Sequence, residues 1–170
     1  SKARDMNVLV ICRLSDELFI KKVQPLQESQ YVDKIFVMRN NRHQSELSKL
    51  VYLDTSKFFF NLPIFNLVYK LFLACKTIKK QKIEFTIGYF LTPHGIISLL
   101  ASRICRIKGA VALIGGFNAI ENGGYPWNLP FKNQAFSRLF ENLLLFFLKH
   151  DYIQVPGEVT QSYLERKKVE

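Results

Sequence analysis

Five short apolar runs alternate with stretches of helical periodicity along this chain, and no other feature restricts its fold as strongly. The predicted strands are residues 6–13, 34–39, 85–90, 110–115 and 152–156. The predicted helices are residues 16–29, 63–81, 92–109, 134–149 and 157–168. Such alternation requires right-handed crossovers, a parallel sheet and helices on both of its faces. We therefore expect an α/β fold, a doubly wound, Rossmann-like, mostly parallel sheet.

Local residues indicate where several of these helices begin and end. Pro63 suits a first helical turn, and Thr92 and Gly109 suit the two caps of the helix 92–109. The apolar face of the second helix is expected to contain Ile64, Leu67, Val68, Leu71, Cys75 and Ile78. The polar stretch 40–50 has no periodic pattern and receives no assignment.

The composition indicates one folded domain. Of the 170 residues, 48% are apolar and 14% are aromatic, which is more than a disordered chain carries. No linker or shift of composition divides the sequence, so residues 6–170 are expected to form a single domain. Residues 1–5 are interpreted as a tail or an expression remnant. The apolar start at residues 6–12 is too short for a signal peptide.

The three cysteines favour a reducing compartment. Cys12, Cys75 and Cys105 are widely spaced, and each falls inside an apolar run without a CxxC or Cys/His grouping. This pattern is typical of reduced core thiols in a cytoplasmic protein. We expect no metal and no cofactor.

The chain is strongly basic, with a net charge of +10 from 24 Lys and Arg against 14 Asp and Glu. Such a charge attracts polyanions or acidic membrane surfaces. Four lysines gather near the end of the helix 63–81: Lys76, Lys79, Lys80 and Lys82. They are interpreted either as a solvated helix end that the helix dipole favours, or as a contact to an anionic membrane surface.

Residues 58–75 approach the length of a membrane span, but their composition argues against a membrane-spanning helix. Asn61, Pro63, Asn66 and Lys70 interrupt the apolar run, whereas spanning requires about 20 predominantly apolar residues. An amphipathic helix with one broad apolar face is the expectation.

The fold class predicts where a ligand binds. In doubly wound sheets, ligands bind beyond the carboxyl ends of the strands, where the connections change side. The candidate loops are 14–16, 40–45, 91–95, 115–133 and 156–158. The loop 115–133 is longer than structureless loops in compact domains generally are, which favours a functional role.

Several familiar motifs are absent from the sequence. There is no G-x-G-x-x-G after the first strand, no GxxxxGK[ST], no GxSxG and no HExxH. These absences argue against a dinucleotide-binding Rossmann domain, a P-loop NTPase, a serine hydrolase of the elbow type and a zinc protease. An acidic cluster of the response-regulator type is also missing.

Three segments, taken in order, resemble the amino-terminal half of GT-B glycosyltransferases. They are Pro93-His94-Gly95, Gly115-Gly116-Phe117-Asn118, and the run from Asp151 to Glu158. The similarity is to the large retaining group that builds bacterial polysaccharides and glycolipids, including capsule and lipopolysaccharide. It implies one half of a GT-B fold, the acceptor side. It further implies transfer of a sugar from a nucleotide sugar to a hydroxyl of a glycan or lipid-linked acceptor.

The sequence departs from the family pattern at four places. Gly115 stands where many members have His, Asn118 replaces Asp, and Gly157 replaces Ser. Arg13-Leu14-Ser15-Asp16 replaces a glycine-rich turn after the first strand. The family places its sugar-nucleotide pocket in a second domain, which these residues do not supply. We therefore expect an acceptor-side half that is inactive alone.

The resemblance and the loop positions together nominate the substrate-binding residues, and no catalytic residue is assigned. The nominated residues are Arg13, Ser15, Asp16, His94, Gly115, Gly116, Asn118, Glu121, Tyr125 and Glu158. Each has a plainer interpretation. His94 fits a solvated polar cap as well as a substrate contact, Asp16 fits a helix cap better than a catalytic group, and Tyr125 fits a loop anchor.

A second functional class also fits the composition. The charge is compatible with a basic, non-enzymatic α/β module that binds nucleic acid or another anionic ligand. The scattered basic residues and the lack of a recognised DNA or RNA module argue against nucleic acid. A complete small enzyme ranks last, because no catalytic constellation is recognisable. For the favoured class we expect a cytoplasmic protein, peripheral on the inner face of the bacterial membrane.

Overall fold

The computed structural model describes residues 5–40, 47–55, 63–114, 134–149, 152–155 and 157–169. The strands are β1 (Met6–Ile11), β2 (Val32–Met38), β3 (Leu50–Tyr52), β4 (Ile83–Tyr89), β5 (Lys108–Ala112) and β6 (Tyr152–Gln154). The helices are α1 (Asp16–Glu28), α2 (Pro63–Lys80), α3 (Ile96–Cys105), α4 (Gln134–Leu148) and α5 (Glu158–Arg166). A short π-helical turn, η1 (Leu91–Gly95), precedes α3.

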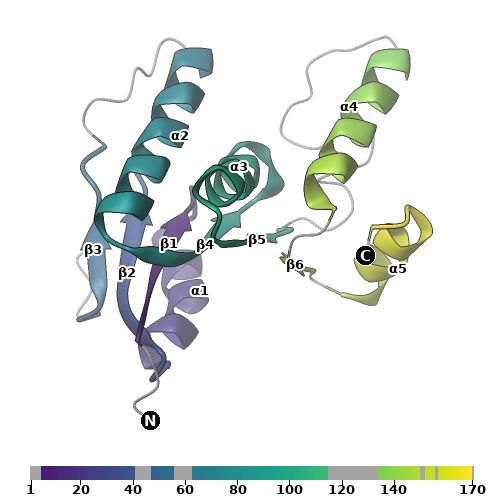
Figure 1. The fold of residues 1–170 in the computed structure, drawn as a ribbon. Coiled ribbons are helices and arrows are strands. Elements are labelled where there is room, and N and C mark those ends of the chain that lie inside the picture. Colours follow the sequence, from purple (N-terminus) through teal and green to yellow (C-terminus); the bar gives the residue numbers. More distant parts are fainter. Residues whose placement is uncertain are drawn as a thin grey trace.

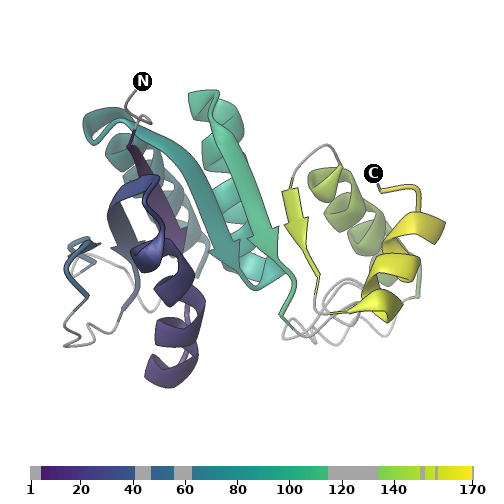
Figure 2. The same cartoon turned by 90° about the horizontal axis from the view of Figure 1, so that it is seen from below.

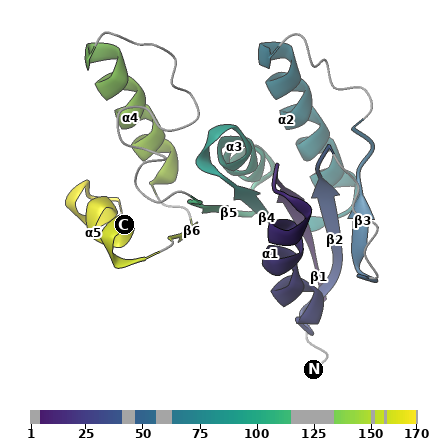
Figure 3. The same cartoon turned by 180° about the vertical axis from the view of Figure 1, so that it is seen from behind.

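The strands form one parallel sheet in the order β3-β2-β1-β4-β5-β6. Helix α1 lies on one face of the sheet, and α2 and α3 lie on the other (Figures 1 and 3). Right-handed crossovers produce this arrangement, because the chain moves one way from β1 and the opposite way from β4. The prediction of a doubly wound, Rossmann-like, mostly parallel sheet is confirmed.

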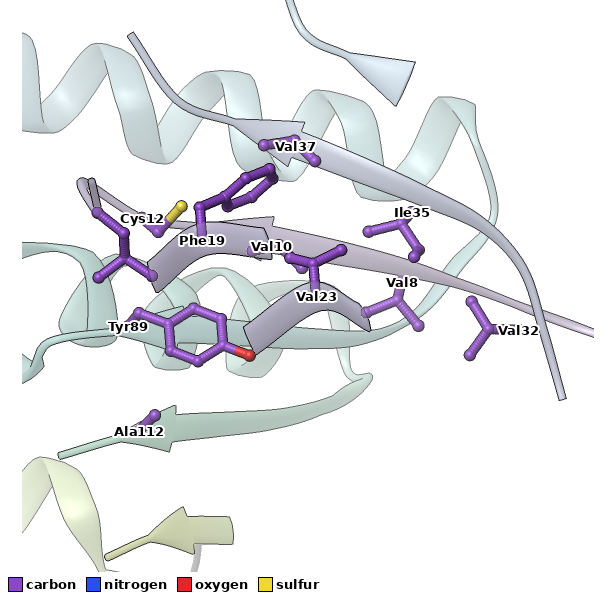
Figure 4. Packing of buried hydrophobic residues seen from close by; sticks show 11 residues of the cluster. Val8, Val10, Cys12, Phe19, Val23, Val32, Ile35, Val37, Tyr89 and Ala112 are labelled. Carbon is purple, nitrogen blue, oxygen red and sulfur yellow. The ribbon is translucent and has the colours of Figure 1, made fainter. Parts of the chain in front are cut away.

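The central strand β1 divides the core into two layers. Val8 and Val10 pack against Phe19 and Val23 of α1, as Figure 4 shows. The alternate residues of β1 pack on the other face, against α2 and α3. That layer contains Leu9, Ile11, Ala74, Ile78, Ile97 and Ala101. Burial on both faces explains why β1 reads as a continuous apolar run.

A third cluster extends the core beyond β5. It joins Leu99 of α3 and Val111 of β5 to Leu144 and Leu148 of α4 and to Leu164 of α5. Within the described ranges, no helix is long and apolar enough to cross a membrane.

Three details of the predicted elements were wrong. A sixth strand, β3, lies in and beyond the stretch left unassigned; with three residues on the sheet edge, it is too short to show a pattern. Thr92 lies inside η1 and does not begin α3. Gly109 does not cap α3 either, since Arg106 ends that helix in the left-handed region at φ 56° and Gly109 lies within β5.

Gly109 is needed for close packing instead. A Cβ at this position would contact the Ser102 side chain of α3 closer than real Cβ contacts come. Glycine therefore lets α3 approach the sheet.

The expected face of α2 is also partly wrong. Val68 is 61% exposed, and among the described side chains of α2 the buried ones are Lys70, Ala74, Thr77 and Ile78. The side chain of Ile64 lies outside the described part. Hydrophobic periodicity did not predict this buried face, because the face consists partly of Ala, Thr and Lys and not only of large apolar residues.

Candidate functional site

The carboxyl ends of the strands bring several predicted loops to one edge of the sheet. In the register of the sheet, Ile11 of β1 pairs with Gly88 of β4, and Gly88 pairs with Val111 of β5. The residues that follow β1, β4 and β5 therefore leave from the same edge, at which the arrowheads of β4 and β5 point in Figure 2. The connections change side between β1 and β4, so this pair of strands is the topological switch point.

The turn after β4 is held by backbone packing. Phe90 has φ 68°, a left-handed conformation that is uncommon outside glycine. The N–H of Gly95 donates to the Phe90 carbonyl at 2.8 Å, and the Phe90 N–H donates to the Ala112 carbonyl at 3.1 Å. A π-helical turn that follows a strained residue is a combination often found at functional sites.

Gly88 and Gly95 allow the Pro93-His94-Gly95 turn to pack closely against the sheet. A Cβ on Gly88 would lie 2.5 Å from the His94 carbonyl oxygen. A Cβ on Gly95 would contact the Val111 side chain and would lie 2.8 Å from the Phe90 carbonyl oxygen. The turn thus rests directly on β4 and β5, and this packing places His94 at the switch point.

His94 is buried, with 6% of its surface exposed, so the interpretation as a solvated histidine is wrong. Burial lowers the pKa of His94 to about 3, with further lowering from the nearby Lys70 and Arg13 cations. The imidazole is therefore neutral at physiological pH. It can donate one hydrogen bond and accept another, and it is no proton donor at pH 7.

Lys70 of α2 reaches the same place and was missed from the sequence. Burial lowers its pKa, as does the Arg13 guanidinium, and only 8% of the residue is exposed. Lys70 lies four residues before Ala74 and eight before Ile78, on the face of α2 that packs against the sheet. This spacing is the signal in the sequence that places Lys70 on the inward face, although a lysine in an apolar run otherwise indicates an interruption.

Asp16 has a structural partner. The Nη2 of Arg39, which follows β2, donates to Asp16 Oδ1 at 2.5 Å and to the Leu14 carbonyl at 2.6 Å. The guanidinium also lies 4.8 Å from the centre of the Phe19 ring. Ser15, not Asp16, is the N-cap residue of α1, so the interpretation of Asp16 as a cap is wrong. The pair fixes the loop after β1.

Cys12, Cys75 and Cys105 are free thiols, but only Cys12 is fully buried, so the prediction of core thiols holds for Cys12 and only partly for the other two. Cys12 begins the loop after β1, and its burial raises the pKa to about 11. Its thiol is protonated and contributes no nucleophile to the site. In the part of the chain that the structure describes, no group of three His, Cys, Asp or Glu side chains is placed to hold a metal.

The remaining nominated residues are scattered or lie outside the described residues. Arg13 and Ser15 are exposed in the loop after β1. Glu158 is exposed at the start of α5, at the same edge but two strands from β4. Five nominated residues lie outside the described residues: Gly115, Gly116, Asn118, Glu121 and Tyr125. The structure therefore brings together Arg13 and His94, and adds Lys70.

The lysine cluster lies away from this site. Lys76, Lys79, Lys80 and Lys82 are exposed at or just beyond the end of α2, whereas Lys70 is near its beginning. Since α2 runs from the carboxyl edge to the amino edge of the sheet, the two groups of charges occupy opposite edges.

No family model matches the sequence, and no curated protein matches it significantly. Solved structures do resemble the fold. The UDP-GlcNAc 2-epimerase of Methanocaldococcus jannaschii has a TM-score of 0.58 at 15% identity, over 97% of this chain and 43% of the epimerase chain. The Neisseria meningitidis enzyme bound to UDP-GlcNAc has a TM-score of 0.61 at 17% identity, over 97% of this chain and 44% of its own. The structure of S. aureus MnaA with UDP has a TM-score of 0.61 at 15% identity, over 95% of this chain and 40% of the MnaA chain.

These similarities concern the fold, at identities too low to transfer an activity. The chain spans less than half the length of each of these epimerase chains. The neighbours share a GT-B-like arrangement, so the coarser part of the predicted resemblance is supported. The chain is a GT-B-like, Rossmann-like α/β domain.

Proposed function

We propose that this chain is the acceptor-side half of a glycosyltransferase. The enzyme would transfer a sugar from a nucleotide sugar to a hydroxyl of a polysaccharide or lipid-linked acceptor. The observation that carries the proposal is that the loop after β1, with Arg13, and the η1 turn, with His94, leave the sheet side by side at the switch point between β1 and β4. This is the place where doubly wound sheets bind ligands. The fold is also shared with enzymes whose structures contain UDP or UDP-GlcNAc.

The properties of the site residues suit sugar recognition. The neutral, buried imidazole of His94 offers a donor and an acceptor, which is the pairing that a sugar hydroxyl requires. Ser15 and Arg13 add an exposed hydroxyl and a fixed cation on the neighbouring loop. No residue of this set is assigned to catalysis. In our proposal, a second domain binds the donor nucleotide and closes the site.

A nucleotide-sugar epimerase is the second candidate, favoured by the UDP-GlcNAc 2-epimerases among the structural neighbours. The two activities differ in their need for an acceptor. An epimerase inverts one carbon of the nucleotide sugar, whereas a transferase releases the nucleotide and joins the sugar to another molecule.

The deciding experiment uses the product of the complete reading frame. It is incubated with a panel of nucleotide sugars, with and without a bacterial lipid and glycan extract. Acceptor-dependent release of nucleoside diphosphate, together with a labelled glycan or glycolipid, supports the transferase. A changed sugar configuration without acceptor, followed by NMR, supports the epimerase and rejects the transferase. The matched pair His94→Ala and Lys108→Gln shows whether the proposed edge is used, since the exposed Lys108 begins β5 at the opposite edge.

We also propose a peripheral location on the inner face of the membrane. The support is the apolar surface of α2, where Phe65, Val68 and Phe72 are each at least 60% exposed at helical spacing. Lys79 and Lys80 extend the same helix with positive charge. Co-flotation with vesicles that contain anionic phospholipid, lost in a Phe65→Ser/Phe72→Ser variant, is the expected result. Equal flotation of the two proteins would reject this location.

A further inference from the structure

We infer that Arg13, Lys70 and His94 form a binding site for a phosphate group at the switch point of the sheet. This inference rests on the proposed function and deepens it, because it names the chemical group that the site takes. The three side chains come from three separate elements: the loop after β1, helix α2, and the turn η1.

The packing of the two helices brings the cations to one place. On α2, Ala74 and Ile78 belong to the same core layer as Ile97 and Ala101 of α3. Lys70 lies on the same face of α2 as Ala74 and Ile78, one turn nearer the carboxyl edge of the sheet. His94, in the turn that precedes α3, lies at that same edge.

The loop after β1 supplies the third group. Ile11 pairs with Gly88, and Gly88 lies directly beneath the His94 backbone. Arg13, two residues beyond Ile11, therefore leaves the sheet beside the η1 turn. In agreement with this placement, the Arg13 charge lowers the pKa of both Lys70 and His94.

The positive charges of Arg13, Lys70 and protonated His94 would repel one another at this partly desolvated edge of the sheet. Burial and the neighbouring cations disfavour the charged forms of Lys70 and His94. A bound phosphate dianion would reverse this effect, because it adds an opposite charge at the point where the three approach. The chemical types are complementary to it: a guanidinium that binds two oxygens, an ammonium point charge and an imidazole N–H.

One more polar atom suggests what the phosphate is attached to. Asn66 lies one turn before Lys70 in the same row of α2, and its buried Oδ1 has no hydrogen-bond partner among the described residues. An amide oxygen accepts a hydrogen bond, so it suits a hydroxyl and not a phosphate oxygen. A sugar or ribose hydroxyl next to the phosphate would satisfy this oxygen, so the ligand class is a phosphate ester or diphosphate. The source is either the diphosphate of a nucleotide sugar or the phosphate of a lipid-linked acceptor.

The test measures binding to the 170-residue chain. Isothermal titration calorimetry with inorganic phosphate, UDP and geranyl phosphate gives the affinities. Backbone NMR of the labelled chain gives the location. We expect Arg13→Gln and Lys70→Met each to weaken binding about ten-fold or more, as loss of a charge-assisted hydrogen bond does. The control Lys108→Gln, an exposed lysine at the start of β5 and at the opposite edge of the sheet, should change affinity less than two-fold. Arg13 is exposed, so its variant decides the matter even if Lys70→Met fails to fold.

The outcomes separate the two sources and the two proposals. Tighter binding of UDP assigns the site to the donor, and tighter binding of geranyl phosphate assigns it to the acceptor. Absence of phosphate binding, or equal affinity in wild type and Arg13→Gln, overturns the inference and leaves the transferase proposal standing. Binding that these variants abolish, in a full-length protein that transfers no sugar, keeps the site and rejects the transferase.

Discussion

Gly88→Ala is expected to destabilise the protein and to displace the proposed site at the same time. The added Cβ would lie 2.5 Å from the His94 carbonyl oxygen, 2.6 Å from the Gly95 Cα and 2.8 Å from the Gly95 nitrogen. The first of these is about 0.9 Å shorter than the 3.4 Å at which ordinary contacts begin. All three obstructing atoms belong to the backbone, so no side chain can rotate away. The φ of Gly88 is not left-handed, which leaves steric overlap as the cause.

Overpacking of this kind costs about 1–3 kcal/mol, and a backbone obstacle favours the upper half of that range. For a chain of this size, the loss corresponds to a fall in Tm of about 4–12 °C. Urea unfolding followed by circular dichroism measures the free energy, and NMR shifts at residues 90–96 report the displaced turn. Gly157→Ala is the control, because no described atom lies within 4 Å of the Cβ that it adds; as a change at the N-cap of α5 it should cost only about 1 kcal/mol or less. A Gly88→Ala protein as stable as the Gly157→Ala control, with an unmoved turn, would refute the packing argument.

Three further predictions follow from the loop after β1 and from the buried imidazole. Asp16→Asn should lower the free energy of unfolding by about 1–2 kcal/mol in urea, between the values for exposed and buried pairs, since Arg39 is buried but the Asp16 side chain is 55% exposed. Glu17→Gln, which breaks an exposed pair, should cost less than about 0.5 kcal/mol, and equal losses would contradict the assignment. The pKa of His94 falls from 6.5 to about 3 on folding, so stability should decrease as pH drops from about 7 toward 3, by at most about 1.4 kcal/mol per pH unit. His94→Asn should show a shallower slope between about pH 7 and 5 in urea titrations, and an unchanged slope would reject this account. The Cys12 thiol, whose pKa is raised to about 11, should resist a disulfide reagent at neutral pH until urea unfolds the chain; rapid labelling of the native protein, located by mass spectrometry, would contradict its burial.

The sequence predicted the sheet well because its central strands are buried on both faces. The apolar runs of β1 and β5 are recognisable without knowledge of their neighbours, since burial on both faces selects their residues. The edge strand β3 lacks this property, and so it escaped notice. Gly109 shows a different limit: a glycine soon after a helix suggests a cap, whereas its real role is to admit Ser102, which only the packed structure reveals.

The edge of the sheet at which the candidate residues lie could be predicted from the sequence, whereas their full set could not. Arg13 and His94 could be nominated because loops after parallel strands leave from one edge. The pairing of Arg39 with Asp16 depends on the adjacency of β1 and β2, and the two residues are 23 positions apart. Lys70 required the orientation of α2 relative to the sheet. Contacts of this type depend on tertiary packing, which no local pattern of residues encodes.

The pairing of β1 with β4 has a consequence for the order of folding. Asn7 pairs with Ile83, and its side-chain amide donates to the Gln81 carbonyl, 74 residues away. The pairing of β1 with β2 closes a much shorter loop. It costs less conformational entropy, and we therefore expect it to form before the pairing of β1 with β4. Arg13 and His94 therefore meet only when this long-range step is complete. Pulse-labelled hydrogen exchange during refolding should show β2 protected before β4, and ligand binding should appear with the later phase.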